Sequence, residues 1–503
     1  MNMPQRPCPP PAPQEVELKL SLPLADSQSL TRLLARVPVL ARRKATHQSL
    51  YNIYYDTPDQ RLRQQRAVLR LRRVGDATSP HWLQTFKTGA SDASALSQRG
   101  EWESPLPGAA LSHQALAATP WAEMDADGSL FAALVPCFVT AFERTAWLVR
   151  RRDGSVVEVA LDLGQVETTG QSAPICELEL ELKAGQPAAL FEIAQEIARS
   201  VAVLPANMSK AQRGFLLAQG GLHQVHQPQR AQSPHLRQNM PVWLVAQQVL
   251  RSAFAQFTSN LDSLRVSDNP EVVHQARVGW RRFKSALHQF KKSLLQPAPT
   301  PSEALRSLLA SLGELRNLDV AQSETLPALA SAYVLGDAQR AQSWQAMTTA
   351  LAQATEQQRQ TVRQALQRPA LGVSLLTMVQ WLEDCFADQQ GAPRHKEAVR
   401  TWAKRRTQRL RRQLEDAQKL ADTPEQWHRV RLLAKRLRYS MEDLQGLLPR
   451  RLAKHGAQQA TAMQNRLGAA RDMAQVSVLV AKLDCDACLV EFLRGVAVGA
   501  ARR

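Results

Sequence analysis

Aromatic residues are scarce in this chain: Phe, Trp and Tyr together make up 5% of its 503 residues. Proteins that hold single-stranded nucleic acid commonly stack the bases on aromatic side chains. The scarcity therefore disfavours a nucleic-acid-binding function.

Cysteine is also rare, with six residues scattered at positions 8, 137, 176, 385, 485 and 488. Disulfide-stabilised secreted domains are far denser in cysteine, so the pattern fits a reducing cytosol. Cys485 and Cys488 form a single Cys-x-x-Cys motif with no second pair and no histidine pair nearby. We therefore expect neither a zinc site nor a redox centre there.

Long hydrophobic runs are missing as well, and none approaches the ~18 residues that a membrane-spanning helix requires. Residues 1–13 are rich in proline and lack the apolar core of a signal peptide, so we expect a disordered leader. These absences predict a cytoplasmic protein without a membrane partner.

Charge is abundant and unevenly distributed. The formal net charge is +18 and the isoelectric point is about 10.1. Residues 1–221 carry a net charge of +1, whereas residues 222–503 carry +17. An anionic partner is expected, and the second half is the part that would bind it.

An alternating stretch near the N-terminus marks the first candidate site. In Glu15-Val16-Glu17-Leu18-Lys19, a β-strand would place the three charged side chains on one face. Two carboxylates on one face can ligate a hard divalent cation, and the lysine suits phosphate. The same alternation is also typical of an ordinary strand with one solvated face.

Two later stretches repeat this alternation. Residues 177–183 read Glu-Leu-Glu-Leu-Glu-Leu-Lys, and residues 68–72 read Val-Leu-Arg-Leu-Arg. Such strands could pair for solubility alone, or close into a barrel with the charged faces inward and helices over the apolar faces. Further strand patterns at 51–56, 81–87, 98–103, 139–151 and 156–163 bring the total to about eight, interrupted near 111–135 by a mostly helical insertion.

Over residues 14–221 these motifs resemble the CYTH superfamily, the triphosphate tunnel metalloenzymes. The resemblance rests on Glu15-x-Glu17-x-Lys19, on Tyr-x-Asp-Thr-Pro at residues 54–58, and on the later charged strands in order. It implies an α+β chain whose first part is an antiparallel eight-stranded tunnel barrel.

The resemblance also implies two sets of site residues. Metal ligands, or supports for metal-bound water, would be Glu15, Glu17, Asp162, Glu177, Glu179 and Glu181. The phosphate clamp would be Lys19, Arg70, Arg72, Lys87, Arg99, Arg144 and Lys210, with Glu101 orienting the clamp or a second metal. A triphosphate needs both sets, because its oxygens need cationic donors and its charge needs a divalent ion.

The reaction class implied is hydrolysis of a terminal phosphoanhydride bond with Mg²⁺ or Mn²⁺ as cofactor. The same superfamily includes thiamine triphosphatases, RNA triphosphatases and class IV adenylate cyclases. The fold alone therefore leaves the substrate open.

The second half contains an internal repeat. Residues 222–238 are expected to be a linker, and residues 239–503 are expected to be amphipathic helices. A tetrad recurs with the same 3, 4, 3 spacing at an offset of 154 residues: His274, Arg277, Arg281 and Lys284 correspond to His428, Arg431, Lys435 and Arg438, and Arg282 corresponds to Arg436. A Leu-Gly-x-x-Arg motif at 312–316 recurs at 467–471. The spacing places each tetrad on one face of a helix. A single basic face of this kind usually only contacts solvent, but its duplication favours an anion-binding surface.

This half resembles the CHAD domain, a helical module rich in histidine and charge that is associated with polyphosphate. The resemblance implies an all-α duplicated helical bundle that binds polyphosphate through the residues of the two tetrads, with Arg282 and Arg436. Asn317 stands where the second copy has Asp472, so the first copy lacks one carboxylate that would orient an arginine, although Asp319 follows.

We therefore expect a metal-dependent enzyme that hydrolyses inorganic triphosphate, joined to a polyphosphate-binding module that could associate with polyphosphate granules. The alternatives are a non-catalytic polyphosphate-binding or targeting protein, nucleic-acid binding by the basic half, a thiamine triphosphatase, and a class IV adenylate cyclase acting on ATP. The clustered carboxylates argue against a pure polyanion binder. No base-recognition pocket supports the cyclase.

Overall fold

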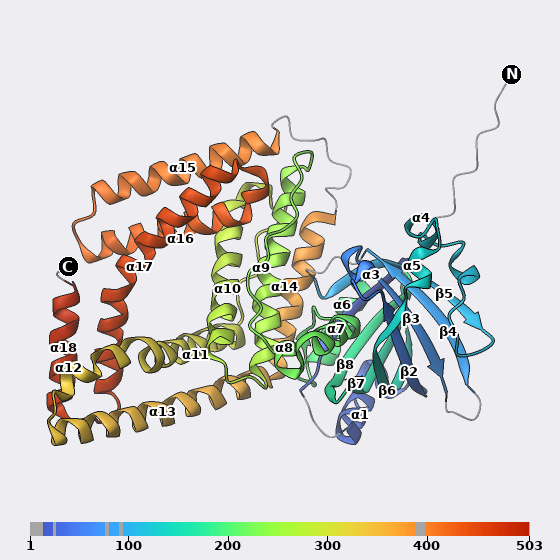
Figure 1. Ribbon diagram of the computed structural model, residues 1–503, viewed down its shortest axis with the longest axis horizontal. Coiled ribbons are helices and arrows are strands. Elements are labelled where there is room, and N and C mark those ends of the chain that lie inside the picture. The colour runs from blue at the N-terminus through green and yellow to red at the C-terminus, as the bar shows by residue number, and fades with distance from the viewer. Residues whose placement is uncertain (1–13, 24–26, 76–79, 90–93, 388–397, 502–503) are drawn as a thin grey trace. The chain divides into compact units, whose positions relative to one another are not determined.

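The computed structural model describes residues 14–23, 27–75, 80–89, 94–387 and 398–501, apart from a few side chains that include those of residues 465–471. The expected leader, residues 1–13, lies outside the described residues. The chain divides into two compact units, residues 1–227 with 375–379 and the remainder, and each is described by itself (Figure 1).

The first unit is built on antiparallel strands. They are β1 (Gln14–Ser21), β2 (Ala45–Asp56), β3 (Ala67–Val74), β4 (His81–Thr88), β5 (Leu96–Leu106), β6 (Val135–Arg150), β7 (Val156–Thr168) and β8 (Gln171–Ala184). Their order is β5-β4-β3-β2-β6-β7-β8-β1, and β1 also pairs with β5, which closes an eight-stranded barrel. A short strand, β9 (Leu204–Pro205), pairs with the end of β1. The predicted barrel is confirmed.

Apolar faces of the barrel strands point outward and are covered by helices and loops. Leu18 and Leu20 of β1 are fully buried, and α6 (Ala188–Ala198) packs against β1 and β8. The other short elements of this unit are α1 (Ser27–Ala35), α2 (Pro38–Ala41), α3 (Arg61–Gln64), η1 (Gln114–Leu116), α4 (Trp121–Met124) and α5 (Ser129–Ala132). The expected helical insertion is thus three single turns, which form an aromatic cluster in which Trp121 packs edge-on against Phe86.

One helix fills part of the barrel interior. α7 (Lys210–Gly220) packs against β6, β7 and β8, and its Phe215 lies against Phe138. A Cβ atom at Gly214 would come within 2.1 Å of the Phe138 ring, so only glycine allows this close approach. Ser209 and Gln212 form a capping box that starts the helix at the barrel wall. α8 (Leu222–Val225) follows, within the segment expected to be a linker.

The second unit is helical. Its long helices are α9 (Val242–Leu264), α10 (Pro270–Gln289), α11 (Glu303–Val320), α13 (Ala338–Leu366), α14 (Pro369–Ala387), α15 (Val399–Lys419), α16 (Pro424–Asp443), α17 (Arg450–Ala481) and α18 (Ala487–Ala501), with a short α12 (Ala330–Val334). Among the described residues, every helix falls short of the length or the apolar content that spanning a bilayer requires.

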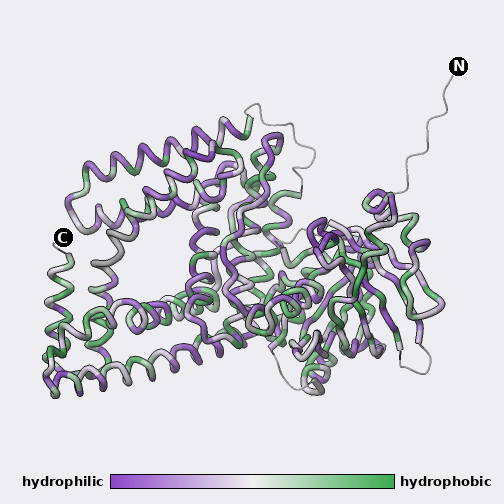
Figure 2. Tube along the Cα trace, viewed as in Figure 1, coloured by the Kyte–Doolittle hydropathy of each residue, from purple (hydrophilic) through white to green (hydrophobic). Residues whose placement is uncertain are grey.

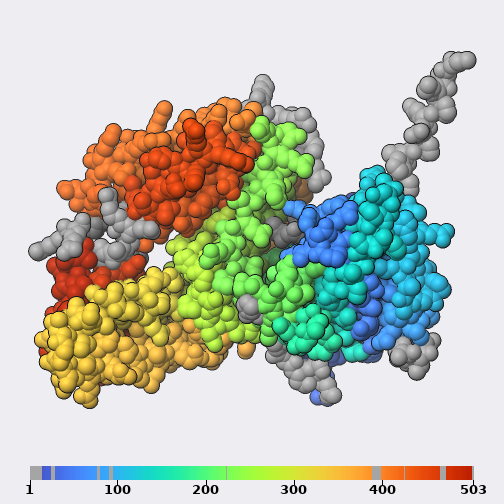
Figure 3. Space-filling model, in the orientation of Figure 1, coloured from blue at the N-terminus to red at the C-terminus, as the bar shows by residue number. Residues whose placement is uncertain are grey.

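The repeated motifs lie on helices that contact each other. The two tetrads are on α10 and α16, which pack together, and the two Leu-Gly-x-x-Arg motifs are on α11 and α17, which also pack together. α15 packs on α16 and is hydrophilic along most of its length (Figure 2). In the space-filling view α15, in orange, forms an outer edge of the helical unit (Figure 3).

Candidate active site

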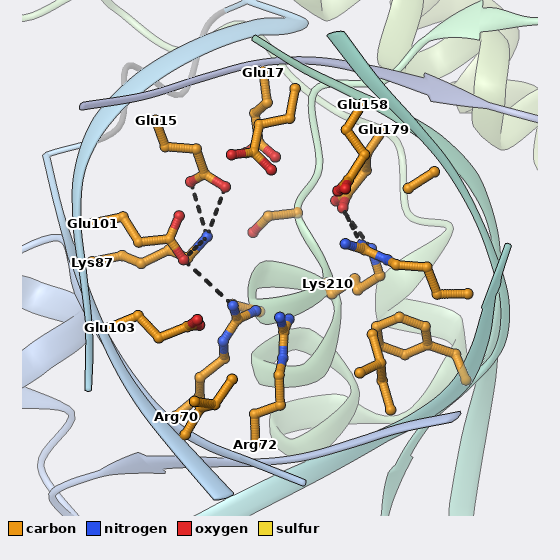
Figure 4. Close-up of a pocket in the computed structure, with 18 of the residues that line it drawn as sticks. Glu15, Glu17, Arg70, Arg72, Lys87, Glu101, Glu103, Glu158, Glu179 and Lys210 are labelled. Atoms are coloured by element: carbon orange, nitrogen blue, oxygen red, sulfur yellow. Dashed lines mark hydrogen bonds and ion pairs between the residues drawn. The ribbon is translucent and has the colours of Figure 1, made fainter. Parts of the chain in front are cut away.

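The inward faces of the barrel strands enclose a cavity of about 390 Å³. Of the residues predicted for the barrel site, twelve line it: Glu15, Glu17, Lys19, Arg70, Arg72, Lys87, Arg99, Glu101, Arg144, Glu179, Glu181 and Lys210. They come from β1, β3, β4, β5, β6, β8 and α7. Figure 4 shows Glu15, Glu17, Glu158 and Glu179 on one side of the cavity, facing Arg70 and Arg72 on the other.

Strand register explains why opposite charges meet in this space. Directly paired residues on neighbouring strands include Glu15 with Arg99, Lys19 with Glu179, Lys87 with Glu101, and Arg144 with Asp162. Paired residues on one face of a sheet have their Cβ atoms about 5 Å apart, which allows direct ion pairs.

One group of ion pairs joins β1, β4 and β5. Lys87 Nζ lies 2.9 Å from Glu15 Oε2 and 3.0 Å from Glu101 Oε1, and Arg99 Nη2 lies 2.7 Å from Glu17 Oε1. Burial and the charges of Arg99 and Arg70 lower the pKa of Lys87. Burial alone would raise the pKa of Glu15, but the charges of Lys87 and Arg99 hold it well below its usual range.

A second group of ion pairs lies on the same inward faces, buried beneath Lys210 of α7. Asp162 and Glu177 are 0% and 1% exposed and are not among the residues that line the cavity. Asp162, Glu177 and Glu179 bring carboxylate oxygens within 4.8 Å of one another, close enough to share one cation. Lys210 Nζ already lies 2.7, 2.5 and 3.0 Å from these three carboxylates.

The lysine occupies the only such three-acid cluster found among the described residues, and Arg144 and Arg213 supply the further positive charges. Burial alone would lower the pKa of Lys210, but Asp162, Glu177 and Glu179 raise it. Arg144 adds hydrogen bonds of 2.7 Å from Nε and Nη2 to the two oxygens of Asp162. A metal ion at this point would have to displace the ammonium group of Lys210.

Arg72 differs from the other cations of the cavity because its described partner is neutral. Its Nε donates to Asn52 Oδ1 at 2.7 Å, and Asn52 is held in turn by Thr140 at 2.9 Å. Burial, followed by the charges of Arg70 and Arg144, lowers the pKa of Arg72 to about 10. An incoming anion would relieve this repulsion, so Arg72 is the strongest candidate phosphate ligand.

Glutamates gather where β1, β8 and β7 run side by side. Glu181 is paired with Glu17 on one neighbouring strand and with Glu158 on the other. Burial and the charges of Glu15 and Glu158 raise the pKa of Glu181, opposed by Lys183, whose Nζ is 2.7 Å away. Like charges in adjacent register positions are destabilising unless a cation joins them. Oxygen ligands with excess negative charge fit a divalent cation such as Mg²⁺ or Mn²⁺.

Five cavity residues lay outside the sequence prediction, namely Tyr54, Glu103, Glu158, Lys183 and Ser209, as did Asn52, which is buried and accepts a hydrogen bond from Arg72. Glu158 and Lys183 continue the alternation of predicted strands, so extending the pattern would have found them. Tyr54 is 3% exposed, and its pKa, which burial alone would raise, is lowered by Arg70 and Arg72. No alternation of charge marks Tyr54 in the sequence.

In the helical unit, the residues predicted to bind polyphosphate differ in accessibility. Arg282 is 1% exposed and bonded to Asp443 and Gln256, which excludes contact with polyphosphate without unfolding. His274, Arg277 and Arg281 on α10, and Arg431, Lys435, Arg436 and Arg438 on α16, are half-buried, while Lys284 and His428 are exposed. Burial and the charges of Arg316 and Arg281 lower the pKa of His274 to about 4.

The repeated glycine has a packing role in the first copy. A Cβ atom at Gly313 of α11 would lie 2.8 Å from Arg277 Nη1, so the glycine lets this arginine lie across α11. Arg316 pairs with Glu324 at 2.8 Å, and Asp319 pairs with Arg359 at 3.3 Å. Arg316 thus takes its carboxylate partner from Glu324, because Asn317 offers none and Asp319 pairs with Arg359. The glycine and arginine of the second copy fall among the undescribed side chains.

The duplication reveals a cationic cluster formed by Arg406, Arg436 and His288. Of these three residues, the sequence prediction included only Arg436. With the 154-residue offset, Arg282 and Asp443 correspond to Arg436 and Gln289, so the second arginine has lost its acid. Burial and the charges of Arg436, Arg406 and Lys291 lower the pKa of His288. In the described part of the chain, Arg406 and Arg436 form no ion pair, and Gln289 Nε2 is buried without a partner.

Comparison with known proteins matches the two units to two domain families. The CYTH domain model matches residues 13–215, and the CHAD domain model matches residues 248–481. An inorganic triphosphatase from Haemophilus influenzae is 33% identical over 208 residues, which are 41% of this chain and 55% of that protein. The chain therefore spans about half the length of this curated relative.

Solved structures show similarity at lower identity. The CHAD domain of the plant Ricinus communis is 24% identical, with a TM-score of 0.47 over 55% of this chain and 91% of that one. A Hippeastrum protein described as having a dominant triphosphatase activity is 19% identical, with a TM-score of 0.28 over 41% of this chain and 97% of that one. Both TM-scores are below 0.5, so no inference is drawn from these likenesses.

Proposed function

Because this chain carries a CYTH domain followed by a CHAD domain, we propose that the first hydrolyses inorganic triphosphate to diphosphate and phosphate and the second binds polyphosphate. The observation that carries the first part is a single cavity in which glutamates face arginines across the barrel (Figure 4). A triphosphate with its divalent ion needs these two kinds of group at opposite sides.

Residues of the cavity take distinct roles in this proposal. Glu15, Glu17, Glu179, Glu181 and Glu158 would hold Mg²⁺ or Mn²⁺, which would act as a Lewis acid on phosphate oxygens. Arg70 and Arg72 would bind the triphosphate from the opposite wall, and Arg72 would do so with little loss of existing contacts.

The remaining cations of the cavity would exchange carboxylate partners for phosphate oxygens as the substrate enters. They are Lys19, Lys87, Arg99, Arg144 and Lys210. Asp162 would keep Arg144 and Lys210 in position and Glu177 would keep Lys210, through the ion pairs already present, and a metal ion held by these two carboxylates would have to displace Lys210. Glu101 would hold Lys87 and Arg70 in the same way. Catalysis would then rest on positioning and charge stabilisation.

Phosphate release from four candidate substrates tests the enzymatic part. The purified chain is given inorganic triphosphate, thiamine triphosphate, ATP or long-chain polyphosphate, each with Mg²⁺ or Mn²⁺ and with EDTA. We expect the highest kcat/KM with inorganic triphosphate and no turnover in EDTA. A clear preference for thiamine triphosphate or ATP would replace the proposed substrate, and turnover in EDTA would refute the role of the metal.

The cluster around Arg436 supports polyphosphate binding by the helical unit. Arg406 and Arg436 repel each other and His288, and Gln289 offers a buried amide donor with no partner among the described residues. A polyanion would relieve the repulsion and satisfy the amide. Binding should weaken steeply with salt because phosphate contacts release counterions.

A further inference from the structure

A second cavity, of about 350 Å³, lies at the end of the barrel that α7 enters. Its wall uses the first residues of β3 and β5 and the last charged residue of β1, Lys19. Five residues line both cavities and stand between the two spaces: Lys19, Val68, Arg99, Ser209 and Ala211.

The two cavities differ in the balance of their charges, because the first mixes eight Lys or Arg residues with its glutamates and the second has cations alone. Seven glutamates line the first cavity, whereas the described residues that line the second include no Asp and no Glu. The second cavity has four cations, Lys19, Arg63, Arg66 and Arg99, and hydroxyl or amide groups such as those of Ser97 and Asn207. Without carboxylates it does not suit a metal ion, and its charge suits an anion.

Lys19 and Arg99 are committed to the first cavity, because their nitrogens lie 2.9 and 2.7 Å from Glu17 Oε1. Arg63 and Arg66 form no ion pair within the described residues; Arg63 donates to Gln60 at 3.2 Å and lies 5.4 Å from the centre of the Phe215 ring. Ser97 Oγ is buried there without a partner. The donors available to a ligand are therefore those of Arg63, Arg66 and Ser97.

The backbone at Arg66 supports a binding role for this arginine. Arg66 has φ of 55°, in the left-handed region that a non-glycine residue adopts only at a cost. Glycine or asparagine would relieve the strain, but the position carries a long cationic side chain at the rim of the cavity.

We propose that this second cavity binds a tetrahedral oxyanion, namely orthophosphate, at Arg63, Arg66 and Ser97. Orthophosphate is a reaction product only if the proposed hydrolysis is correct. The binding of orthophosphate to this cavity does not depend on that proposal. Because no Asp or Glu is found among the described residues of its lining, the anion binds free of a divalent ion. Orthophosphate can then occupy this cavity while triphosphate occupies the first.

Hydrogen exchange of the full chain, with and without inorganic phosphate and without metal, tests the binding directly. We expect phosphate to protect the amides of residues 61–67 and 94–99 in the wild type and in the control Arg152→Ala, a change at an exposed arginine outside the barrel cavities. Protection should be lost in Arg63→Ala/Arg66→Gly, where glycine tolerates the backbone angle, and kept in Arg63→Lys. Equal protection in the double variant and the wild type would overturn the proposal.

Inhibition by phosphate separates this proposal from the proposed activity. Orthophosphate in the second cavity should give the wild type a noncompetitive component against triphosphate that depends on Arg63 and Arg66, while inhibition by phosphate in the first cavity should be the same in the wild type and the double variant. Arg63→Ala/Arg66→Gly should keep kcat/KM within about twofold and raise the noncompetitive inhibition constant at least about tenfold, as expected for the loss of charged hydrogen bonds. Purely competitive inhibition of the wild type would refute the second site. Protection by phosphate without any triphosphatase activity would leave the site standing and remove only the proposed function.

Discussion

In the barrel, Lys87, Arg99, Arg144 and Lys210 each lie within 3.0 Å of a carboxylate oxygen. In the helical unit, by contrast, Arg406 and Arg436 form no ion pair among the described residues, and the charge of Arg436 lowers the pKa of Arg406. The barrel is nearly neutral, with a net charge of +1 over residues 1–221, against +17 over residues 222–503. The first arrangement suits a ligand that brings its own cation and exchanges partners on entry. The second suits a polyanion that arrives without one.

The largest effect expected from this difference is the loss of the barrel's carboxylates. Glu17→Gln should lower kcat/KM for triphosphate roughly a hundredfold or more, because metal-ion stabilisation of the transition state amounts to several kcal/mol. Glu123→Gln, at an exposed position on α4, should leave the rate unchanged. Polyphosphate binding by Glu17→Gln should match the wild type, and a parallel loss of both properties would mean that the two units do not divide the work.

Charge reversal in the helical unit should have the opposite pattern. Arg406→Glu/Arg436→Glu should weaken polyphosphate binding by on the order of tenfold or more and lower its salt dependence. Calorimetry at two salt concentrations measures both, and Arg306→Glu, at an exposed arginine of α11, is the matched control. Hydrolysis of triphosphate should not change. Tight duplex DNA binding without polyphosphate binding would instead support the nucleic-acid alternative.

Within the barrel, adjacent arginines should behave differently. Arg72→Ala should raise KM for triphosphate about tenfold to a hundredfold, since hydrogen bonds to charged groups contribute ~1.5–3 kcal/mol. Arg73, which stacks on Tyr51 at 5.1 Å and does not line the cavity, should tolerate alanine with less than about a twofold change. Equal effects on KM would contradict the assignment of inward faces.

A substitution that restores the acid missing from the second copy should reduce the contrast between the units. Gln289→Asp would give Arg436 the partner that Asp443 gives Arg282. We expect polyphosphate affinity to fall several-fold, because the anion must then compete with an internal carboxylate. Gln289→Leu, which adds no charge, serves as the control and should fall less; an equal loss would assign the effect to packing.

The smallest effect concerns His274. Its pKa of about 4 leaves it neutral at pH 7, and a bound polyanion would raise that pKa. Proton uptake should then accompany binding, so the affinity should rise as the pH falls from 7.5 to 5.5. His274→Gln should show a flatter pH profile. An unchanged profile would exclude His274 from the binding surface.

Residue alternation was a reliable guide to the barrel because its period of two directly sets which side chains face inward. Eleven of the twelve predicted cavity residues lie on the face shared by Glu15 and Glu17 or on the corresponding faces of the other strands, Lys210 lies on α7, and the family resemblance singled out all twelve. The alternation did not predict how far along the barrel axis each inward side chain lies, and so which of them reach the open cavity. Asp162 and Glu177 are on the expected face, but α7 closes that end of the barrel and Lys210 lies among their carboxylates.

The sequence by itself determined strands with one charged face and the duplication of the helical half, since strand periodicity and repeat spacing are local properties of the chain, whereas closure of the strands into a barrel was implied by the family resemblance. Only the tertiary structure decided which charges neutralise each other, because ion pairs join residues far apart in the sequence. Arg282 illustrates this: its helical face looked available, but packing of α10 against α16 buries it on Asp443, while the corresponding Arg436 meets Arg406 of α15. The cavity at Arg63 and Arg66 depends likewise on α3, β5 and α7 meeting at one end of the barrel.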